Sequence, residues 1–248
     1  MRERAVKSSI LAGIAGIALA VSAAGAAQAE TSAAAVAAVA DAGRPAADTA
    51  RDADRKPGEI VSFAGVKQGD IVAEIAPGGG YYTRILAKTV GPQGHVYAMM
   101  PSFFASRPGG LDAINKLAEE YGNVTVVVAD FADFTLEKPV DLVWTTENYH
   151  DMANGNIAGI NASVFKALKP GGIYFVEDHS APGTGVSATS TIHRIDPAAV
   201  KEQVAAAGFK LEAESDLLVN PADPGNISPR DVKPGVSTKF ALRFKKPG

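Results

Sequence analysis

From residue 57 onward, short apolar runs alternate with longer segments whose apolar residues recur at helical spacing. The apolar runs predict strands at residues 71–73, 96–99, 124–128, 141–145 and 173–176. The helical spacing predicts helices at residues 58–64, 81–88, 111–121, 157–168 and 197–207. Asp196 and Pro197 suit the N-cap and first position of the last helix, because an aspartate oxygen accepts from free N–H groups there and proline needs no hydrogen-bond acceptor.

This alternation predicts an α/β fold with a doubly wound, mostly parallel, seven-stranded sheet of the Rossmann-like kind. Residues 209–217 and 239–244 complete the sheet as a C-terminal antiparallel strand pair at one edge. The β-branched run at 124–128 is typical of a strand buried on both faces. Ligands of such sheets bind outside the carboxyl ends of the strands. We therefore look for chemistry at those ends.

The first residues predict export rather than part of the fold. A basic start with Arg2, Arg4 and Lys7 precedes an apolar run at 10–21, and an A-x-A site ends at Ala29. We expect residues 1–29 to be a Sec-type signal peptide and the protein to be periplasmic or secreted. The apolar run is too short to span a bilayer, so no integral membrane association is expected after cleavage. Residues 30–54 are predicted to be an Ala-rich flexible lead or a short helix, and 55–248 one domain.

Composition excludes several classes of function. The chain has 24 basic and 27 acidic residues and no basic run, so nucleic acid is not an expected partner. It has no cysteine, which excludes disulfides, thiolate zinc sites and a cysteine nucleophile. A small-molecule substrate remains the expected partner.

A glycine turn follows the first predicted strand, and glycine lets a ligand approach the backbone closely. The helix after the turn offers free N–H groups to an anion. Gly80 is followed by Tyr81 rather than by Lys-Ser/Thr, and Thr83 stands where a dinucleotide fingerprint needs Gly or Ala. Both those motifs are excluded, and a turn without a ligand stays an alternative. The residues expected at this cradle are Glu74, Ala76, Pro77, Gly78, Gly79, Gly80 and Tyr81.

Polar and titratable residues follow the later strands. They include Asp130 after the third, Glu147, Tyr149, His150 and Asp151 after the fourth, and Glu177, Asp178 and His179 after the fifth. Three of the four histidines, His193 included, thus fall at the expected ligand edge, and we expect His150 and His179 to converge there. A cluster of histidine and aspartate there could bind a divalent metal or act in proton transfer. The spacing matches no metal signature, so no bound metal is expected. The loop at 181–191 is either a mobile lid or a surface linker.

The motifs EIAPGGGYYT, VGPQGHVYAMMPS, ALKPGG and EDHS resemble the class I S-adenosylmethionine (SAM)-dependent methyltransferases. The NYHDM and HRID segments resemble an exported bacterial subgroup of predicted methyltransferases. The resemblance implies SAM as cofactor on an acidic-x-Gly-x-Gly-x-Gly loop, with Glu74, Ala76, Gly78 and Gly80 in those places. Ala76 departs from that pattern.

The resemblance also implies roles for residues beyond the glycine turn. Met99 or Met100 stands where an acidic residue would bind the ribose, and methionine cannot accept that hydrogen bond. Adenine is expected near Asp130 and Phe131. Other expected residues are Glu147 for the cofactor and His150, Asp151 and His179 for catalysis. His150, oriented by Asp151 or a neighbour, is the first candidate for a base, and His179 is the second.

The function expected from these residues is methyl transfer from SAM to an unknown small-molecule or protein acceptor. The alternative is a catalytically degenerate small-molecule binding protein on the same fold, because the ribose contact is missing. A third, structural or partner-binding role would show as a large exposed apolar patch.

Overall fold

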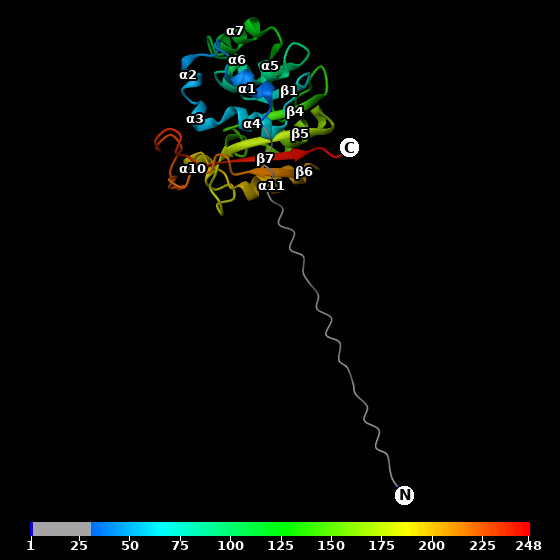
Figure 1. Cartoon of the computed structure of the whole chain (residues 1–248), viewed down its shortest axis with the longest axis vertical. Coiled ribbons are helices and arrows are strands. Elements are labelled where there is room, and N and C mark those ends of the chain that lie inside the picture. The colour runs from blue at the N-terminus through cyan, green and yellow to red at the C-terminus, as the bar shows by residue number, and fades with distance from the viewer. Residues whose placement is uncertain (2–30) are drawn as a thin grey trace.

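The computed structural model describes Met1 and residues 31–248, so almost all of the predicted signal peptide lies outside the described residues (Figure 1). Within residues 31–248, the strands form one seven-stranded sheet in the order β3-β2-β1-β4-β5-β7-β6. The first five strands run parallel, whereas β7 pairs antiparallel with both β5 and β6. The predicted fold class and the C-terminal strand pair are therefore confirmed. The strands are β1 (Ile71–Ile75), β2 (His95–Pro101), β3 (Val124–Ala129), β4 (Val140–Thr146), β5 (Leu168–His179), β6 (Lys210–Ser215) and β7 (Lys239–Lys245).

Helices cover both faces of the sheet, and side chains alternate between two apolar cores, as the pleat of a strand requires. Val72 and Trp144 lie in the core beneath α1, α4, α5 and α7, whereas Ala73 and Val143 lie in the core beneath α8, α9 and α11. The helices are α1 (Ala33–Val39), α2 (Ala46–Thr49), α3 (Asp52–Arg55), α4 (Pro57–Ala64), α5 (Tyr81–Val90), α6 (Ser102–Ala105), α7 (Asp112–Tyr121), α8 (Tyr149–Met152), α9 (Ile157–Ala167), α10 (Thr189–Ile192) and α11 (Pro197–Ala206).

The segment before Arg55, predicted as a flexible lead or a short helix, is helical and contributes residues to the core. Ser32 caps α1 by accepting from the backbone N–H of Ala35, and Ala35 and Ala38 are buried against α4 and α5. Small side chains three apart let α1 pack closely on these helices, a pattern too short to stand out in an Ala-rich stretch. The helices α2 and α3 follow and lead the chain to the carboxyl ends of the strands (Figure 1).

Two strand predictions need correction. β3 is an edge strand with Thr125 and Val128 exposed, so its β-branched run is not buried on both faces. β5 begins at Leu168 rather than 173, because the chain pairs with Val140 before a register shift and then continues opposite Leu142.

The Asp196 side chain caps α11 by accepting from the N–H of Ala198, as predicted. No helix among the described residues is long and apolar enough to cross a membrane.

Candidate functional site

The glycine turn between β1 and α5 borders a cavity of about 250 Å³. Ala76 adopts a left-handed φ of 54°, and its N–H donates to the Met99 carbonyl at 2.9 Å. A Cβ added at Gly78 or Gly79 would meet no atom within 4 Å, although both residues line the cavity. Glycine at these two positions therefore leaves open space against the backbone.

Glu74 lies under this turn with 3% of its surface exposed. It accepts a hydrogen bond from Thr83 Oγ1 at 2.6 Å. Burial raises the pKa of Glu74 to about 7, against the opposing effects of the Thr83 hydrogen bond and the more distant Arg84. The acidic residue predicted for the cradle is therefore present, and it titrates near neutral pH.

A network of four charged groups lies beside the glycine turn, at the carboxyl ends of β4 and β5. Arg55 donates to Glu147 at 2.5 Å, and Lys239 Nζ lies 3.0 Å from Glu147 and 3.3 Å from Glu177. Burial raises the pKa of Glu147, but Lys239 and Arg55 more than offset it and hold that pKa at about 2. Burial raises the pKa of the fully buried Glu177. The Arg55 guanidinium also lies over the Tyr81 ring, 4.8 Å from its centroid.

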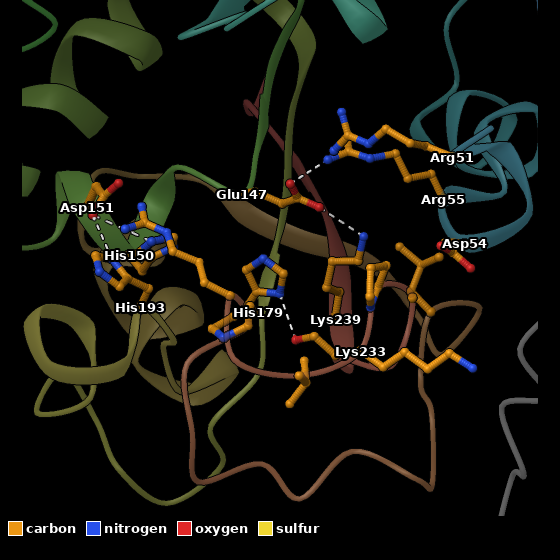
Figure 2. Close-up of a pocket in the computed structure, with 17 residues that line it drawn as sticks. Arg51, Asp54, Arg55, Glu147, His150, Asp151, His179, His193, Lys233 and Lys239 are labelled. Carbon is orange, nitrogen blue, oxygen red and sulfur yellow. Dashed lines mark hydrogen bonds and ion pairs between the residues drawn. The ribbon is translucent and has the colours of Figure 1, made fainter. Parts of the chain in front are cut away.

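The predicted histidines line a second cavity, of about 360 Å³ (Figure 2). The ring of His150 lies 6.3 Å from that of His179 and 5.5 Å from that of His193, measured between centroids. Asp151 lies on the same wall, with its Oδ1 3.5 Å from His150 Nε2. The structure thus brings together His150, Asp151, His179 and His193.

Asp178 orients His150, a role that the sequence leaves to Asp151 or a neighbour. The fully buried Asp178 carboxylate lies 2.8 Å from His150 Nδ1 and accepts from the backbone N–H groups of His150 and His179, each at 2.7 Å. A proton on Nδ1 leaves the Nε2 lone pair of His150 directed to the cavity. Burial lowers the pKa of His150, but Asp178 more than offsets this, so that pKa is raised. Burial lowers the pKa of His179 to about 4.

The two cavities are separate but adjoin. Gly78 and Gly79 line the first cavity and the histidines line the second, whereas Arg51, Arg55 and Glu147 line both. Figure 2 shows Glu147 between the arginines and the histidine-lined side. A ligand on the glycine turn and another among the histidines would therefore meet at Glu147.

Four predicted cofactor residues lie elsewhere. Met99 and Met100 are buried in the two opposite cores, with 0% and 3% of their surfaces exposed, and neither lines the glycine-turn cavity. Asp130 is exposed and accepts from the N–H of Ala132 as a turn residue, and Phe131 packs half-buried at the rim of a core. Their predicted roles at ribose and adenine gain no support from these positions.

Three residues of the site were not among the candidates predicted from sequence. Arg55 comes from α3, Lys239 from β7 and Arg51 from just before α3. Arg55 and Lys239 each lie 92 positions from their partner Glu147 along the chain, so no local spacing marks this pairing. The loop at 181–191 is held by hydrogen bonds, since the buried Asp196 carboxylate accepts from the backbone N–H groups of Gly183 and Gly185.

Comparisons with known proteins agree with this architecture. Residues 72–172 match the model of a family described as a methyltransferase domain. The protein-L-isoaspartate O-methyltransferase of Ignicoccus hospitalis is 30% identical over 127 residues, which are 50% of this chain and 54% of that protein. The chain thus spans about half the length of this curated relative.

Solved structures show the same fold at low sequence identity. The glycopeptide N-methyltransferase MtfA, complexed with SAM, has a TM-score of 0.54 and 17% identity, with 77% of this chain and 86% of that chain covered. The [4+2]-cyclase SpnF has a TM-score of 0.59 and 16% identity, with 79% and 81% covered. The predicted resemblance to the class I methyltransferases is therefore confirmed at the level of domain and fold.

Proposed function

Because residues 72–172 match a methyltransferase-domain family and the chain has the class I fold, we propose that this protein binds SAM at the glycine turn and transfers its methyl group. The acceptor, an unidentified small molecule or protein, enters the histidine-lined cavity. The observation that carries the proposal is the open space above Gly78 and Gly79. Both residues line the cavity, and a Cβ added at either would meet no protein atom within 4 Å.

The residues around this cavity fit the cofactor. Glycines 78 and 79 admit it to the backbone, and Arg51 and Arg55 offer positive charge to its carboxylate. Glu74 offers a carboxylate to its amino group. When bound, SAM supplies an electrophilic methyl group. MtfA, a structure of the same fold, is a complex with SAM, which supports this cofactor.

The acceptor side contributes position and a proton acceptor. Methyl transfer depends largely on holding the acceptor atom in line with the methyl group of SAM. The main role of the walls of the second cavity is therefore to position the acceptor. An acceptor that has to lose a proton would give it to Nε2 of His150, whose other nitrogen is held by Asp178. His179 lies 6.3 Å away between ring centroids and is the second candidate.

A second candidate function is small-molecule binding without methyl transfer. The side chains of Met99 and Met100 are buried in the cores, so they add no ribose acceptor to the glycine-turn cavity. SpnF, with the same fold, is a [4+2]-cyclase, so this fold alone does not fix the reaction. Binding of SAM without any methyl acceptor, or binding of another small molecule in its place, would favour this candidate.

We also propose that the protein acts outside the cytoplasm. The basic start, the apolar run and the A-x-A site ending at Ala29 support export. Mass spectrometry of the protein from its native host tests this. A mature N-terminus at Glu30 is expected, and an intact Met1 terminus on cytoplasmic protein would contradict the proposal.

Two matched glycine variants test the cofactor site. Gly78 and Gly69 both have left-handed φ values, 56° and 85°, and both have open space at the Cβ position. Replacing either with valine imposes similar backbone strain, but only Gly78→Val projects into the cavity. We expect Gly78→Val to abolish SAM binding measured by titration calorimetry, and Gly69→Val to retain it. Gly79→Val, which has no left-handed strain, should also lose binding; equal affinity in all three variants would contradict the proposal.

A further inference from the structure

The structure assigns a divalent-metal site to His150, Asp151 and His193, on the wall of the histidine-lined cavity. One ligand atom from each residue lies within 4.8 Å of the others. Figure 2 shows the three side chains gathered at one side of the cavity, apart from His179 and Lys239. The spacing of these residues along the chain matches no metal signature, because they come from α8 and from the C-cap of α10.

The distances suit a small cation. Asp151 Oδ1 lies 3.5 Å from His150 Nε2 and 3.6 Å from His193 Nδ1. Ligands bonded to zinc at about 2.0–2.1 Å in a tetrahedron lie roughly 3.4 Å from one another. The same separations are longer than good hydrogen bonds between these atoms. The carboxylate therefore stands where it can share a cation with both imidazoles.

The imidazoles are prepared as ligands. His150, with 5% of its side chain exposed, has Nδ1 held by the buried Asp178, so Nε2 points to the cluster. A carboxylate behind a ligating histidine fixes the ring and raises its basicity, as at many zinc sites. Among residues 31–248, His193 Nδ1 is a buried nitrogen without a hydrogen-bond partner. A cation would satisfy this unpaired atom, whose burial otherwise costs free energy.

The donor atoms, from two imidazoles and one carboxylate, determine which metals the site would prefer. Such donors suit zinc and neighbouring transition metals, whereas magnesium and calcium prefer sites made of oxygen alone. Three protein ligands leave a position open to the cavity, the arrangement found in catalytic rather than structural sites. If the proposed methyl transfer holds, a bound cation would polarise an oxygen of the acceptor in place of proton removal by His150.

Metal binding can be measured on the purified protein without SAM or acceptor, so it is independent of the cofactor proposal. Titration calorimetry with Zn²⁺, and with Mg²⁺ as comparison, measures affinity and stoichiometry. We expect one Zn²⁺ per chain and no comparable binding of Mg²⁺. Absence of saturable Zn²⁺ binding would overturn the assignment.

Variants locate the metal. His193→Ala and Asp151→Asn remove ligands whose side chains are 31% and 57% exposed, so both proteins should fold. Each should weaken Zn²⁺ binding by more than the roughly 10–100-fold loss seen when only a supporting partner is removed. The control is His95→Ala, because His95 starts β2 and does not line the cavity. Unchanged affinity in His193→Ala, or equal loss in His95→Ala, would refute the site.

Discussion

The buried Glu74 makes the stability of this protein depend on pH in a definite direction. Its pKa rises from 4.5 to about 7 on folding because burial disfavours the charged carboxylate. Between these values the native state keeps a proton that the unfolded chain has released. Stability therefore falls as the pH rises from about 4.5 to 7, and this contribution levels off above 7. At 1.36 kcal/mol per pKa unit, the full loss is roughly 3 kcal/mol.

Replacing Glu74 with Gln removes this ionisation while an amide oxygen can still accept from Thr83. Urea unfolding at pH 5 and pH 8 gives the free energy of unfolding for parent and variant. We expect Glu74→Gln to gain stability relative to the parent on going from pH 5 to pH 8, by up to roughly 3 kcal/mol. Comparing the two proteins at each pH cancels the titration of the histidines. The control is Glu119→Gln, since Glu119 is exposed on α7.

One result would refute the reasoning about Glu74. If the difference in unfolding free energy between parent and Glu74→Gln is the same at pH 5 and pH 8, the carboxyl does not change its protonation on folding in this range. The same holds if Glu119→Gln shows an equal pH dependence.

Three further predictions concern residues around the site. Arg194→Ala should cost about 3–5 kcal/mol in urea unfolding, because the fully buried guanidinium pairs with Asp223 at 2.7 and 2.9 Å and its loss leaves that carboxylate uncompensated; a loss below 1 kcal/mol would contradict this. Asp178→Asn should cost about 1.5–3 kcal/mol by the same assay, because an amide group can no longer accept from every donor around His150; an unchanged midpoint would show that another group serves them. Ala76→Gly should be neutral or raise stability by up to about 1 kcal/mol, because glycine relieves the left-handed φ of 54°; the loss of about 0.5–1 kcal/mol usual for Ala→Gly would contradict it.

The elements that could be predicted from sequence are those with strong local patterns. The turn at 77–80, the β-branched strands and the Asp196-Pro197 helix start each carry their own signal, and the structure confirms them. The edge position of β3 could not be predicted, because a β-branched run looks the same in a central and an outer strand. The packing of α1 could not be predicted, because its buried residues are alanines and the surrounding sequence is also rich in alanine. No pattern of apolar and polar positions therefore marks its buried face.

The location of the candidate site could be predicted from the sequence, but the contacts between its side chains could not. Strand ends place His150, Asp151 and His179 at one edge, as the sheet topology requires. Glu147 is held by Arg55 of α3 and Lys239 of β7. These two residues lie far apart in the sequence, and only the folded chain brings them to Glu147. The division into two adjoining cavities also depends on side-chain packing and has no counterpart in sequence spacing.

The central claim, that the glycine turn holds SAM, is tested most directly by titration calorimetry of the purified protein with SAM and with S-adenosylhomocysteine. Our account predicts saturable binding of both with one site per chain, lost in Gly78→Val and retained in Gly69→Val. Absence of heat from either ligand, with a folded protein confirmed by circular dichroism, would contradict it.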